Sequence, residues 1–114
     1  MYRQIPLDTV IERDFLPQAV IGLSPYGFSE QRGLDFIEGS DDFDTFYGAA
    51  VLIEDKIPVV LKHYRGHPYN TVTMYLPAEI TKVEEITSLL AFIAEKMWIP
   101  VEWFTWQRAD DPTL

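Results

Sequence analysis

The chain contains no cysteine, which excludes disulfides, thiolate nucleophiles and zinc–sulfur sites. It has no apolar run near the ~20 residues that a membrane span needs, and no apolar segment of signal-peptide type follows residue 1. Neither phosphate-binding glycine pattern, G-x-G-x-x-G or G-x-x-x-x-G-K-[ST], occurs. From these absences we expect a soluble, cytoplasmic protein without a nucleotide or other cofactor.

Basic residues are scarce. Nine Lys and Arg stand against 18 Asp and Glu, which gives a net charge of −9 at pH 7. Phosphate groups repel such a chain, so we do not expect nucleic acid or an anionic membrane as a partner. An acidic surface favours solubility and a basic protein partner. The 114 residues, 47% of them hydrophobic, fit a single domain, residues 1–114, with one core.

Acidic residues are absent from residues 56–78, and this segment also carries the main fold signal. β-branched and apolar residues at 49–53, 57–64 and 71–77, separated by two turns, predict a three-stranded meander over 49–77. With Asp55 and Lys56 at the tip of the first turn, Leu52 faces Val59. The second turn, at 66–69, places Leu61 opposite Met74.

This register sorts the side chains onto two faces, because neighbouring residues of a strand point in opposite directions. The face predicted to be buried holds Ala50, Leu52, Val59, Leu61, Val72, Met74 and Leu76. The opposite face holds Lys62, Tyr64, Thr71, Thr73 and Tyr75.

A helix and a further strand are predicted after the meander. Thr81 and Glu84 have the spacing of a capping box, and a helical apolar stripe at Val83, Ile86, Leu89, Leu90, Ile93 and Met97 predicts a helix over 82–97. Pro100 ends the helix, and residues 101–107 read as a strand. We therefore expect an α+β fold, mainly an antiparallel sheet with the helix packed on one face. The arrangement of residues 1–47 stays open.

Two histidines suggest one class of function. His63 and His67 stand four residues apart, but a metal site needs further ligands that nothing nearby supplies, so we predict no metal. Imidazoles with a carboxylate from the 38–44 loop, such as Asp42, could act in acid–base chemistry. A small hydrolase or isomerase is therefore the alternative function.

The preferred prediction is a non-catalytic binding or assembly module. Aromatic residues are enriched at interaction hot spots, and charged residues orient a partner. The predicted contact surface consists of Lys62, Tyr64, Arg65, Tyr75, Phe104 and Trp106. It would engage a protein partner or a second copy of the chain, giving a homo-oligomer. The sequence identifies neither the partner nor the oligomeric state.

Overall fold

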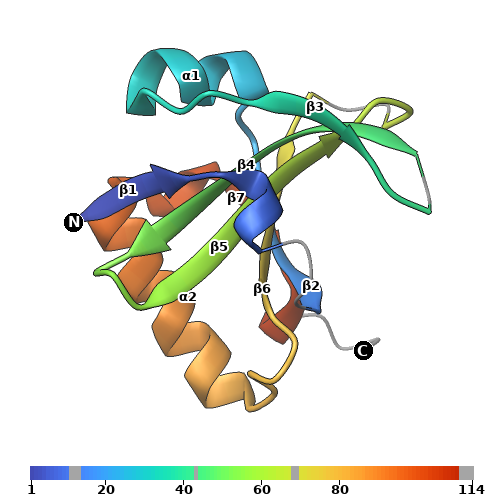
Figure 1. Ribbon diagram of the computed structural model, residues 1–114. Coiled ribbons are helices and arrows are strands. Elements are labelled where there is room, and N and C mark those ends of the chain that lie inside the picture. Colours follow the sequence, from blue (N-terminus) through green and yellow to red (C-terminus); the bar gives the residue numbers. More distant parts are fainter. Residues whose placement is uncertain (11–13, 43, 68–69, 111–114) are drawn as a thin grey trace.

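A computed structural model describes residues 1–10, 14–42, 44–67 and 70–110 of the chain. Within these ranges, seven strands form one antiparallel sheet in the order β1-β4-β5-β6-β2-β7, and β3 also pairs with β4 (Figure 1). The strands are β1 (Tyr2–Ile5), β2 (Phe15–Ile21), β3 (Ile37–Ser40), β4 (Thr45–Ile53), β5 (Ile57–Tyr64), β6 (Val72–Pro77) and β7 (Phe104–Gln107). The helices are α1 (Pro25–Arg32) and α2 (Val83–Met97). The α+β class with a mainly antiparallel sheet is confirmed.

The first 47 residues, which the sequence left open, contribute β1, β2, α1 and β3. Strand β2 lies inside the sheet, between β6 and β7. Its ladder with β6 shifts register between Pro17 and Ala19. Proline has no N–H to donate, and it occurs within sheets mainly at edges and bulges. Pro17 is therefore the reason why the sequence pattern does not predict β2 as an interior strand.

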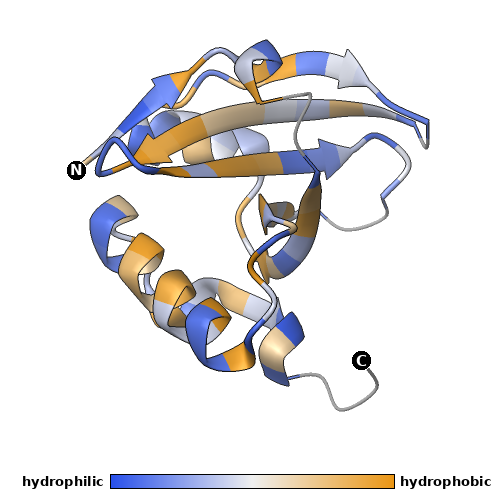
Figure 2. Cartoon of the chain, turned by 60° about the horizontal axis from the view of Figure 1, so that its bottom comes forward, coloured by the Kyte–Doolittle hydropathy of each residue, from blue (hydrophilic) through white to orange (hydrophobic). Residues whose placement is uncertain are grey.

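The main core lies between the sheet and α2, and Figure 2 shows hydrophobic residues along both. On α2, the buried side chains are Ile86, Leu90, Ile93, Ala94 and Met97. Val83 is exposed, so the predicted stripe is wrong at its first position. The capping box is also wrong, because the N-cap is Lys82 and no side chain caps the helix. Glu84 and Glu85 in the first turn complement the helix dipole instead.

The register of the first hairpin differs from the prediction by one residue. Val51 pairs with Val59 and Ala50 with Val60, so the predicted pairing of Leu52 with Val59 is wrong. The turn uses three residues, Glu54 to Lys56, and the first two have positive φ. One extra turn residue turns every β4 side chain to the other face. On the β5–β6 side, Leu61 pairs with Met74 as predicted.

The predicted strand over 101–107 is wrong in its first half. Val101–Trp103 is a 3-10 turn, in which the Trp103 N–H donates to the Pro100 carbonyl over 3.0 Å. The strand starts at Phe104, and Trp103 and Phe104 both pack against the main core. In the described part of the chain, no helix is long and apolar enough to cross a membrane.

The sheet face opposite α2 is covered as well. Ala50 of β4 and Val60 of β5 form a smaller buried cluster there with Val10. The short 3-10 helix η1 (Leu7–Thr9) adds Leu7, and the start of β2 adds Phe15. The N-terminal segment therefore covers part of the face that carries Lys62, Tyr64 and Tyr75.

Candidate functional site

A pocket of about 240 Å³ opens on the sheet face opposite α2, between the sheet and the N-terminal segment. Its lining combines aliphatic and aromatic side chains with a few polar ones. The described residues that line it are Leu7, Val10, Asp14, Phe15, Ser40, Asp41, Phe46, Val60, Lys62, Tyr64 and Tyr75. The pocket therefore gathers Lys62, Tyr64 and Tyr75, three of the predicted contact residues, with groups that come from residues 1–47.

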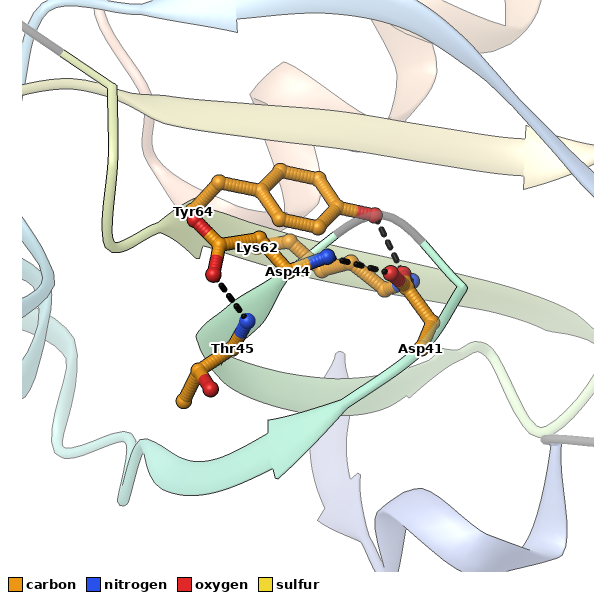
Figure 3. A network of polar contacts seen from close by, with 5 residues as sticks. All are labelled: Asp41, Asp44, Thr45, Lys62 and Tyr64. Carbon is orange, nitrogen blue, oxygen red and sulfur yellow. Dashed lines mark hydrogen bonds and ion pairs between the residues drawn. The ribbon is translucent and has the colours of Figure 1, made fainter.

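The polar part of the pocket is centred on Asp41 (Figure 3). Asp41 Oδ2 lies 3.3 Å from Lys62 Nζ and accepts a hydrogen bond from the Tyr64 hydroxyl at 2.5 Å. The Lys62 and Asp41 side chains are only 20% and 27% exposed. A partly buried ion pair keeps a fixed geometry when further hydrogen bonds satisfy its atoms. The carboxylate thus joins the end of β3 to β5.

Three aromatic rings surround the Lys62 ammonium. Its nitrogen lies 4.5 Å from the ring centroid of Phe46, 5.2 Å from that of Tyr75 and 5.7 Å from that of Tyr64. Each ring within about 6 Å attracts a cation through its quadrupole. Rings and carboxylate together hold a positive charge at the wall of a largely apolar pocket.

Two glycines set the position of the Phe46 ring. Gly39 pairs with Phe46 across the β3–β4 ladder, and Gly48 lies two residues further along β4. A Cβ atom at Gly39 would lie 2.9 Å from the ring, and one at Gly48 would lie 2.8 Å from it. A side chain at either position would meet the ring, so the two glycines leave the space that the ring occupies beside Lys62.

Hydrogen bonds of Asp41 and Asp44, in the turn that follows β3, aim Asp41 at the pocket. Asp44 Oδ1 accepts from the Thr45 N–H at 2.7 Å, and its Oδ2 accepts from the Gly66 N–H at 3.2 Å. The Asp44 N–H in turn donates to Asp41 Oδ1 at 3.3 Å. Asp44 therefore ties the turn to the end of β5, and Asp41 is left to face Lys62.

Burial changes the acidity of both tyrosines. It raises the pKa of Tyr64, and the hydrogen bond to Asp41 raises it further, because that bond needs the phenol proton. Burial also raises the pKa of Tyr75, although its contact with the Tyr64 hydroxyl works in the opposite direction. Both phenols therefore keep their protons to higher pH than a free tyrosine does.

These raised pKa values predict a loss of stability in alkali. In the unfolded chain, both phenols ionise near pH 10, whereas the folded state keeps their protons to higher pH. Their contribution is present in full below pH 10 and is lost as the pH rises towards the native pKa values. We expect the free energy of unfolding to fall less steeply above pH 10 in Tyr64→Phe than in the wild type. Urea titrations from pH 8 to 11 measure this, and equal slopes would contradict it.

The other predicted contact residues lie elsewhere. Arg65 is exposed in the turn after β5, where its N–H donates to the Thr45 carbonyl at 2.9 Å. Phe104 and Trp106 lie on β7, which β6 and β2 separate from β5. Phe104 packs against the core on the α2 side. Phe104 therefore lies away from Lys62, Tyr64 and Tyr75, which line the pocket.

The histidines lie apart from the pocket. His63 Nδ1 is 2.7 Å from the Thr71 carbonyl oxygen, and the ring centroids of His63 and His67 are 6.2 Å apart. His63 lines a separate, open hollow with Tyr26, Phe36 and Tyr47, and none of the described residues lining it is a carboxylate. Asp42 is exposed. Among residues 1–10, 14–42, 44–67 and 70–110, no three His, Cys, Asp or Glu side chains group as metal ligands would.

Comparison with protein-family models, with curated proteins and with solved structures found no match for this chain.

Proposed function

We propose that this protein is a non-catalytic binding or assembly module, and that the pocket at Asp41, Lys62 and Tyr64 receives a side chain of a protein partner. One observation carries the proposal: an aromatic and aliphatic pocket contains a fixed ion pair in its wall. Such a combination offers an apolar anchor point together with oriented polar groups, as hot-spot pockets at interfaces do.

The size of the pocket supports a side chain as its occupant. Pockets for drug-sized molecules have volumes of roughly 300–1,000 Å³, and this one has about 240 Å³. A single aromatic or branched aliphatic side chain fills a space of this order. The partner would therefore insert one residue and spread its remaining contacts over the rim.

The charges favour a basic neighbourhood for that residue. Asp41 pairs with Lys62, whereas Asp14 is an exposed acidic residue among those that line the pocket. The whole chain carries a net charge of −9. Complementary charge speeds association and orients the partner, so we propose a partner segment with an apolar residue flanked by Lys or Arg.

The geometry of the site does not support the alternative function, a small hydrolase or isomerase. It needs His63, His67 and an acid of the 38–44 loop in one cleft. Asp41 instead faces Lys62, and Asp44 accepts from backbone N–H groups of the turn.

A pocket-filling variant tests the proposal. Val60 is a buried residue in the pocket lining, and Val60→Phe fills the space with a ring. Val20→Phe makes the same replacement at a partly exposed position of β2 outside the lining, as a matched control. Partners are captured from the source cells with both variants and the wild type, and their dissociation constants are measured with purified protein.

We expect Val60→Phe to bind at least about 10-fold more weakly, a difference of about 1.4 kcal/mol. The control should bind like the wild type. Thermal unfolding must show that both variants are folded. A partner that binds all three proteins equally would refute the role of the pocket.

A further inference from the structure

Trp98, at the C-terminal end of α2, is a large apolar side chain in an unusual position. It is 78% exposed, and its φ of 56° places it in the left-handed region. The residue that ends a helix in this way is usually glycine, because a Cβ atom disfavours that conformation. Neither burial nor backbone preference accounts for a tryptophan at this position.

The backbone that carries the indole is firmly held. Arg32 of α1 donates from Nε to the Met97 carbonyl at 2.8 Å and from Nη2 to the Trp98 carbonyl. The Trp98 N–H donates back to Glu95 O at 3.3 Å. Val101, three residues further on, is 76% exposed and adds a second apolar group. An anchor on a rigid base loses little conformational entropy when it binds.

We propose that Trp98 of one copy inserts into the Lys62 pocket of a second copy, so that the chain assembles head to tail. This inference rests on the proposed function of the pocket and names its occupant. The pocket is lined by aromatic and aliphatic side chains, which suit an apolar indole ring. The Lys62 ammonium can face the indole ring, and Ser40 and Asp14 offer acceptors for the indole N–H.

Charge complementarity supports the same pairing. The guanidinium of Arg32 lies at the base of Trp98. Asp14, an exposed acidic residue, is among the residues that line the pocket. Because each copy carries −9 overall, copies repel one another at long range, and added salt screens that repulsion. The association should therefore strengthen when salt rises from low to moderate concentration.

The positions of the two partners determine the kind of assembly. Trp98 follows α2, which packs on one face of the sheet (Figure 1). The pocket opens on the other face. A copy therefore cannot fill its own pocket. Each contact uses the indole of one copy and the pocket of the next, which is a heterologous contact that grows into chains or closes into rings.

Two variants with complementary defects test the proposal by sedimentation velocity. Trp98→Gly keeps the pocket and removes the indole. Val60→Phe keeps the indole and fills the pocket. If Val60→Phe does not fold, Leu7→Trp fills the pocket from a partly buried position of its lining. We expect the wild type to form oligomers as its concentration rises and each variant alone to remain monomeric. An equimolar mixture of the two variants should form dimers and nothing larger.

Two controls make a negative result interpretable. Trp98→Gly places glycine in the left-handed position, so its melting temperature should rise by about 3–6 °C and not fall. Tyr26→Ala removes another exposed aromatic residue and should leave association unchanged. A monomeric wild type, oligomers of Trp98→Gly, or a mixture that stays monomeric would each overturn the head-to-tail assembly. The proposed function itself would stand if Val60→Phe still lost a captured partner.

Discussion

Replacing Ile53 with alanine is expected to lower the free energy of unfolding by about 2–5 kcal/mol, the range found for buried Ile and Leu truncations. Ile53 is fully buried against the α2 side of the sheet. Leu52→Ala removes the same number of carbon atoms from the adjacent, partly exposed residue. The free energy of unfolding of Leu52→Ala should fall by less than about 1.5 kcal/mol, because the Leu52 side chain buries less apolar surface on folding.

This pair of variants tests the register of the β4–β5 hairpin directly. The observed ladder pairs Ile53 with Ile57 and Leu52 with Pro58. In the register predicted from sequence, Leu52 pointed into the core. Urea unfolding of both variants at one pH gives the two differences. A larger loss for Leu52→Ala than for Ile53→Ala would contradict the observed register.

Replacing Gly48 with alanine is the second change expected to have a large effect. The new Cβ atom would lie 2.8 Å from Phe46 Cε1 and 3.3 Å from Leu7 Cδ2. The ring also lies against Gly39, so it cannot move along the sheet towards that side. Overpacking of this kind typically costs about 1–3 kcal/mol. We expect a loss of that size in the free energy of unfolding.

A double-mutant cycle with Phe46→Leu separates this clash from a general intolerance of Gly48. Leucine removes the ring atoms that the new Cβ atom meets, so Gly48→Ala should cost at least about 1 kcal/mol less in that background, a coupling typical of contacting residues. Equal costs in both backgrounds would show that the ring does not limit the site. The packing of the Phe46 ring against Gly48 would then not be what holds the ring beside Lys62.

Periodicity predicts the parts of this fold that depend on local pattern. The alternation on both sides of the second turn places Leu61 and Met74 on one face and Lys62, Tyr64 and Tyr75 on the other. The observed β5–β6 ladder has that register. The register of the first hairpin could not be predicted in this way. Glu54 and Asp55 adopt positive φ, but the sequence there has no glycine or asparagine of the kind that marks such turns. The turn is therefore one residue longer than the sequence predicts.

The site depends on contacts over long sequence separations, which a pattern cannot supply. Asp41 is 21 residues from Lys62, and its neighbours Asp42 and Asp44 have the same chemistry in sequence. Only the turn geometry selects Asp41 as the group that meets the ammonium. The cover from Leu7, Val10 and Phe15 likewise comes from the segment whose arrangement the sequence left open.

The central claim is that partners enter the pocket beside Asp41, Lys62 and Tyr64, and chemical-shift mapping tests it most directly. Isotope-labelled protein is titrated with a captured partner, or with Val60→Phe as the donor of Trp98, and the shifts of backbone amides and tyrosine rings are followed. We expect the largest changes at Lys62, Tyr64 and Tyr75. Unchanged signals there, with changes gathered around Tyr26, Tyr47 and His63 instead, would contradict it.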